Sequence, residues 1–129
     1  MKYNFLKTLF FVSFDRAIEL VTEGLEKEGF EVLTKIDVQA TLKEKLDDEF
    51  RKYQILGAIN PSYFHKALMA ELNIGTMMPC NVIIMEMDDG KVRVCAIEPL
   101  ASIIAISNGE LNSIAQHVHS KLETVINNL

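Results

Sequence analysis

At 129 residues the chain is long enough for one domain, residues 1–129, with a core that needs no disulfide or structural metal. Hydrophobic residues make up 49% and charged residues 24%, a globular composition that excludes an intrinsically disordered chain. The net charge is -5, no apolar run approaches the roughly 20 residues of a bilayer-spanning helix, and there is no signal-peptide core, so we expect a cytoplasmic protein without membrane or nucleic-acid partners.

The first part of the chain predicts alternating strands and helices. Leu6–Val12 is aromatic and aliphatic with little alternation, which favours a central strand covered on both faces. Ser13 is placed to cap an amphipathic helix after it. A second strand is expected over Phe30–Val38, followed by a short helix over Leu42–Phe50 behind a capping box that starts at Thr41.

The middle of the chain holds a strand followed by a proline-started helix. Tyr53–Ile59 is apolar enough for an interior strand, and Gly57 within it indicates a close backbone approach or a bulge. Asn60-Pro61 predicts a helix start, because asparagine caps the first turn and proline at the first helical position lacks a donor that had no partner. We expect this helix to reach about Leu72.

A hairpin is predicted over Cys80–Glu98 around Asp89-Gly90, the dipeptide favoured in two-residue type I′ turns. That register places Ile84 opposite Cys95 and forms two cross-strand ion pairs, Asp88–Lys91 and Glu86–Arg93. The opposite face is expected to be the core side, with Ile83, Met85, Met87, Val92, Val94 and Ala96. The ion-pair face is still half apolar, which predicts cover by another element, a ligand or a second subunit.

The last part of the chain predicts helix. Pro99–Ile106 is expected to hold a helical turn, and Ser107–Glu110 offers a capping box for a final amphipathic helix. The order of elements, strand, helix, strand, helix, strand, helix, hairpin and helix, predicts an α+β fold. We expect a two-layer sandwich in which a mostly antiparallel sheet has helices packed on one face.

Two cysteines and three histidines are the candidate reactive groups. Cys80 and Cys95 form no Cys-x-x-Cys motif, and the predicted register keeps them too far apart for a disulfide. His117 and His119 point about 200° apart on a helix, so they do not share a metal. His65 and Cys80 flank the same connection, so a thiolate or metal pair stays open beside an ordinary packing role.

Five blocks of the sequence carry a family resemblance. They are Phe30–Lys43, Tyr53–Pro61, His65–Leu68, Ile74-Gly75 and Pro79–Val82, with weaker agreement at Glu98-Pro99 and in the last helix. In this order they resemble the family known as domain of unknown function 302, over nearly the whole chain. The resemblance implies a compact α+β protein, often dimeric, with no assigned activity.

The same resemblance implies where a site would lie. Asn60, Pro61, His65 and Cys80 match the family pattern, so a family site is expected around the start of the Asn60-Pro61 helix. The strand before Asn-Pro often carries a cysteine in the family, whereas this chain has Ile59. That departure counts against a function that needs two cysteines, either redox or metal binding.

The sequence therefore predicts a cytoplasmic homodimer that binds a small ligand or partner near Asn60, His65, Cys80 and Asn81. One alternative is a thiol-dependent or redox enzyme in which Cys80 is the nucleophile and His65 its base, which requires a depressed thiol pKa. Another is a transition-metal binder that uses Cys80, His65 and methionine sulfurs. The sequence assigns no catalytic residue, metal site or cofactor.

Overall fold

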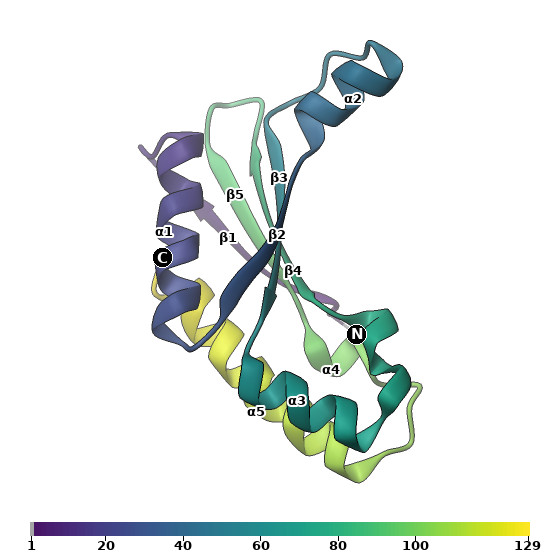
Figure 1. Cartoon of the computed structure of the whole chain (residues 1–129). Helices are drawn as coiled ribbons and strands as arrows, with labels where there is room; N and C mark the ends of the chain where they lie inside the picture. The colour runs from purple at the N-terminus through teal and green to yellow at the C-terminus, as the bar shows by residue number, and fades with distance from the viewer. Residues whose placement is uncertain (1) are drawn as a thin grey trace.

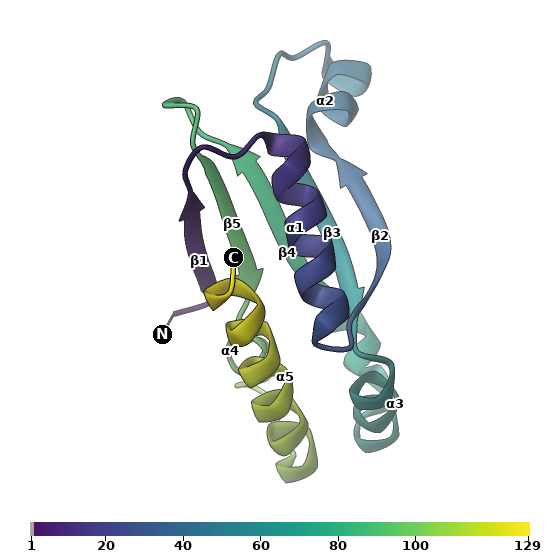
Figure 2. The same ribbon diagram turned by 90° about the vertical axis from the view of Figure 1, so that its left-hand side faces the viewer.

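The computed structural model describes residues 2–129 and has a sheet with helices on one face (Figures 1 and 2). The five strands are antiparallel in the order β1-β5-β4-β3-β2. They span Asn4–Leu9 (β1), Glu31–Asp37 (β2), Tyr53–Ile59 (β3), Cys80–Glu86 (β4) and Val92–Ile97 (β5). The α helices are Phe14–Lys27 (α1), Val38–Leu46 (α2), Pro61–Ala70 (α3), Pro99–Ser102 (α4) and Gly109–Asn127 (α5), and a 3₁₀ helix covers Leu72–Met77 (η1). The predicted α+β sandwich is confirmed.

The main core lies between the sheet and helices α1 and α5. Successive strand residues point to opposite faces, so alternate residues of each strand enter this core. Its largest fully buried side chains include Phe30, Leu25, Leu56, Ile84 and Leu122. Burying each such side chain contributes about 2 kcal/mol, so this layer holds the fold together. No helix within residues 2–129 is both long and apolar enough to cross a membrane.

Two helix starts differ from the sequence prediction. Asp37 caps α2 by accepting a hydrogen bond from the Ala40 amide at 2.9 Å, so the helix starts at Val38 and the capping box predicted at Thr41 is wrong. The Thr41 hydroxyl instead donates to the Asp37 carbonyl. Asp37 is a short polar residue four positions before Thr41, and its side chain accepts from a free amide of the first turn, so the helix begins earlier.

The cap of the final helix lies one residue later than predicted. Asn108, rather than Ser107, accepts from the Leu111 amide at 3.1 Å and caps α5. The cap predicted at Ser13 is confirmed, since its hydroxyl accepts from the Arg16 amide at 3.1 Å.

The first strand is an edge strand, so the prediction of a central strand is wrong. β1 pairs only with β5 and ends at Leu9. The aromatic residues that suggested burial follow the strand: Phe10 is exposed, and Phe11 is fully exposed in a turn with φ of 59°. Their apolar character therefore does not reflect a strand covered on both faces.

The hairpin has a three-residue loop, Asp88–Gly90, instead of the predicted two-residue turn. The Met87 amide donates to the Lys91 carbonyl at 2.8 Å, and Gly90 adopts φ of 81°. This is the pattern of a type I turn followed by a left-handed glycine. The extra loop residue shifts the register by one, and such a shift moves every side chain of one strand to the other face.

The corrected register changes which face of β4 is buried. Ile84 faces Val94 and Ile83 faces Cys95, so Ile83, Met85 and Met87 do not lie on the core side. The predicted ion pairs are also wrong. Asp88 pairs with Arg51 and Lys91 pairs with Asp89.

Candidate functional site

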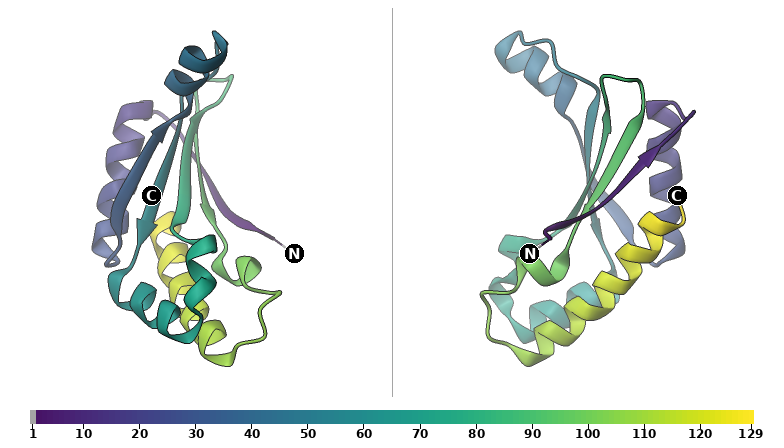
Figure 3. Two further views of the ribbon diagram at one scale, coloured as in Figure 1. Left: turned by 45° about the vertical axis from the view of Figure 1, so that its right-hand side comes forward. Right: turned by 180° about the vertical axis from the view of Figure 1, so that it is seen from behind.

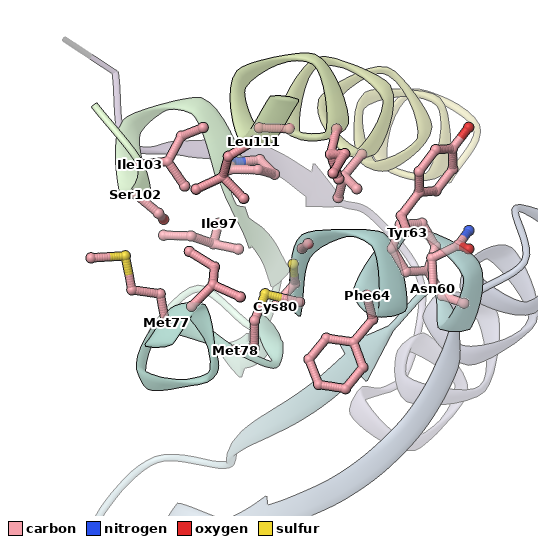
Figure 4. Close-up of a pocket in the computed structure, with 17 residues that line it drawn as sticks. Asn60, Tyr63, Phe64, Met77, Met78, Cys80, Ile97, Ser102, Ile103 and Leu111 are labelled. Atoms are coloured by element: carbon pink, nitrogen blue, oxygen red, sulfur yellow. The ribbon is translucent and has the colours of Figure 1, made fainter. Parts of the chain in front are cut away.

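A cavity of about 50 Å³ lies where α3, η1, α4 and α5 meet the ends of the sheet. Figure 4 shows its lining side chains pointing toward one another from these separate elements. The lining is mainly apolar and includes Phe64, Ala67, Ile74, Met78, Leu111 and Ala115. Asn60, Cys80 and Ser102 add polar groups to the wall. Two of the predicted site residues, Asn60 and Cys80, therefore lie on one cavity.

Asn60 is held at the helix start without capping it. The predicted cap is wrong, because no hydrogen bond joins its side chain to the first turn of α3. Its Nδ2 donates instead to the carbonyl of Glu28 at 3.3 Å, at the carboxyl end of α1, where carbonyls lack helical partners. The amide of Asn60 is therefore directed toward the end of α1, and its side chain forms one edge of the cavity wall.

Cys80 starts β4 and brings a neutral thiol to the same wall. Its side chain is buried, and burial raises the pKa of the thiol to about 11. Desolvation disfavours the charged thiolate. The enzymatic alternative required a depressed pKa, so the environment of Cys80 counts against it. Cys95 is also a free thiol and lies on the opposite face of the sheet.

Cys80 is expected to resist alkylation. Because its pKa is raised from 9.0 to about 11, the thiolate fraction at pH 8 falls roughly 100-fold relative to an ordinary cysteine. We expect iodoacetamide to label Cys80 in a Cys95→Ser variant at least about 100 times more slowly in the folded protein than in urea. Similar rates in the two states would contradict the buried environment described for Cys80.

His65 and Asn81 lie outside the cavity. His65 is exposed on α3, in a shallow depression with Lys66, Met69 and Glu110. Asn81 is exposed and points to the face of the sheet opposite Cys80. The structure therefore does not bring the predicted pair of His65 and Cys80 into one pocket. Within residues 2–129, no group of three or more His, Cys, Asp or Glu side chains is placed to hold a metal ion.

A comparison with protein-family models matches residues 6–129 to DUF302, domain of unknown function. The chain belongs to the DUF302 family. Its fold is that of the crystal structure of an uncharacterized conserved DUF302 protein from Bacillus stearothermophilus, with a TM-score of 0.90 over 98% of each chain at 23% identity. A comparison with curated protein sequences finds no match.

This DUF302 chain also contains a buried acid that the sequence analysis did not identify as important. Glu98 is only 8% exposed, and its Oε1 accepts from the Leu100 amide at 2.9 Å at the start of α4. Its Oε2 lies 2.6 Å from Nδ1 of His119 on α5. The pair fixes α4 against α5 beside the cavity, because Pro99 and Ser102 of this segment line it.

The Glu98–His119 pair had only a partial sequence signal. Glu98-Pro99 repeats the polar-residue-then-proline pattern of Asn60-Pro61, which marks a helix start. The partner, His119, is 21 residues away and its ring packs on Phe5 with 5.1 Å between centroids. Helical periodicity predicts which side of α5 carries His119, but it does not predict which residue His119 contacts.

Proposed function

We propose that this DUF302 protein is a cytoplasmic homodimer that binds a small, mainly apolar molecule in the cavity beside Asn60 and Cys80. The observation that carries the proposal is an apolar cavity with few polar groups on its wall. Small-molecule sites are typically concave and apolar, with a small number of polar groups that orient the ligand.

The chemistry of the wall supports a neutral ligand. Cys80 stays protonated at neutral pH, since burial raises its pKa. No charged side chain is among the residues that line the cavity. Burying apolar ligand surface contributes about 25 cal/mol per Å², so an apolar group that covers about 150 Å² contributes about 4 kcal/mol. A charged ligand would lose its hydration without gaining a partner.

Two features support the other parts of the proposal. Both cysteines are free thiols, which fits a reducing compartment such as the cytoplasm. One face of the sheet carries exposed apolar side chains, including Leu6 and Ile36, and Figure 1 shows no helix over that face. An apolar face of this kind fits an assembly of more than one chain.

Filling the cavity is expected to abolish ligand binding. Ala115 is 5% exposed and lines the cavity from α5, so Ala115→Val places two more carbon atoms in the ligand volume. Ala40→Val on the exposed face of α2 is the matched control. In native mass spectrometry of gently purified protein, we expect a bound small molecule on the wild type and on Ala40→Val, and none on Ala115→Val.

The experiment has a second readout and a contradicting outcome. Xenon, which enters apolar cavities, is expected to shift the NMR signals of Ala67 and Ala115 in the wild type and in Ala40→Val. The same bound mass on Ala115→Val would place the ligand elsewhere. The absence of a saturable xenon shift in the wild type would show that the cavity does not accept an apolar guest.

A further inference from the structure

The sheet face opposite α1 and α5 carries an unbroken apolar row. The strand register places Leu6, Cys95, Ile83, Ile55 and Ile36 side by side, one from each strand. We call these five residues the apolar row. Leu6 is 50% exposed and Ile36 is 46% exposed. Figures 1 and 3 show no helix over this face.

The helix α2 follows β2 and stands beside the same face (Figure 1). It leans away from the layer of α1 and α5 (Figures 1 and 3), and none of its residues is buried. Leu46 at its end is 70% exposed. A nine-residue helix is marginal in water unless its apolar side is packed. A partner on this side of the sheet would therefore bury both the apolar row and the apolar side of α2.

The two charged strand residues of this face lie at opposite ends of the sheet. Its basic strand residue, Arg93, lies on one side of the apolar row, and its acidic strand residue, Glu31, lies on the other. A two-fold axis that reverses the strand direction lays the Arg93 side of one copy over the Glu31 side of the other. Within residues 2–129, Nε of Arg93 is a buried nitrogen without a hydrogen-bond partner.

The size of the face also fits a dimer. Five strands of six or seven residues form a surface about 24 Å across and about 20 Å along the strands, or about 500 Å² per copy. Two such faces bury about 1,000 Å², which reaches the lower bound for a specific interface before α2 is counted. An isologous contact uses the same patch on both copies, so a two-fold axis through the centre of this face brings the two apolar rows together without a separate complementary surface.

We propose that a second copy of this chain packs face to face on the apolar row, and that this contact forms the homodimer. The inference rests on the homodimer of the proposed function and assigns its surface. The two sheets pack about 10 Å apart, as in a sandwich. The α2 helix of each copy lies at the border of the contact, where the partner covers its apolar side.

Charge introduced into the apolar row tests this assignment. We expect Ile83→Lys and Leu6→Lys each to raise the dimer dissociation constant at least about 100-fold, because the symmetric contact buries two unpaired ammonium groups. Met69→Lys is the control, since Met69 is 77% exposed on α3 away from this face. Analytical ultracentrifugation at micromolar concentrations measures the effect, with circular dichroism to confirm folding.

The outcomes separate the surface from the dimer itself. The proposal is supported if the wild type and Met69→Lys are dimers while Ile83→Lys and Leu6→Lys are folded monomers. A dimeric wild type whose row variants remain dimeric overturns the surface but leaves the homodimer. A monomeric wild type overturns both. If Ile83→Lys does not fold, Leu6→Lys decides, because its side chain is half exposed in the single chain.

Discussion

Replacing Gly57 with alanine is expected to lower the free energy of unfolding by about 3 kcal/mol, since the added carbon has no room. A Cβ on Gly57 would lie 2.7 Å from Cγ of Pro79 and still closer to Oγ1 of Thr34. The Thr34 hydroxyl comes from β2, which is paired with β3, and the Pro79 carbon belongs to a closed ring that cannot turn aside. The sheet must therefore shift to admit one methyl group.

Urea denaturation followed by circular dichroism measures this loss. Gly109→Ala is the matched control, because a Cβ at Gly109 meets no atom within 4 Å and is expected to change stability by less than about 1 kcal/mol. Thr34→Ala removes one of the two clashes, so the double variant is expected to recover at least about 1 kcal/mol relative to additive losses. Equal stability of Gly57→Ala and Gly109→Ala would refute the close approach.

Removing the Glu98 carboxylate is expected to cost about 3 kcal/mol of stability in Glu98→Ala. The substitution deletes the cap of α4, typically worth about 1 kcal/mol, and the short hydrogen bond to His119, where a charged partner contributes about 1.5–3 kcal/mol. Because α4 forms part of the cavity wall, the same variant is also expected to weaken ligand binding.

Thermal unfolding and ligand retention provide the two readouts for this variant. Glu110→Ala is the control, an exposed acid in the first turn of α5, and is expected to change stability by less than about 0.5 kcal/mol. Glu98→Gln keeps an oxygen that can accept from the Leu100 amide, so its loss is expected to be smaller than that of Glu98→Ala. A loss in Glu98→Ala no greater than in the control would show that the pair with His119 contributes little.

Local sequence patterns predicted the helices and strands well, but they predicted the wrong turn for the hairpin. The strand Tyr53–Ile59 and the close approach at Gly57 are confirmed, because apolar run length and glycine position are local properties. The two-residue turn was wrong because Asp89-Gly90 also fits a three-residue loop, which uses the same glycine conformation. Pairing across the strands decides between them, and the dipeptide does not contain that information.

Half of the predicted site residues share the cavity, and the periodicity of helix and strand explains why the other two do not. Asn60 and Cys80 line it, since Asn60 directly follows β3 and Cys80 starts the neighbouring strand β4. His65 was grouped with them because it is close in sequence. Residues two positions apart on a helix point about 200° away from each other. Because Ala67 is buried, His65 must point toward solvent. Neither Asn60 nor Cys80 has a tested role, and both stay predictions.

The length of the hairpin loop has a consequence for how the chain could change. With three residues in the loop, β4 turns Val82 and Ile84 to the core and Ile83 to the apolar row. Deleting one loop residue would exchange these two sets, because side chains alternate along a strand. Both sets are aliphatic, so the core would still be filled, while Asn81 would turn inward. Whether the hairpin loop has an odd or an even number of residues therefore decides, more than the composition of β4 does, which side chains of β4 lie on the exposed face of the sheet.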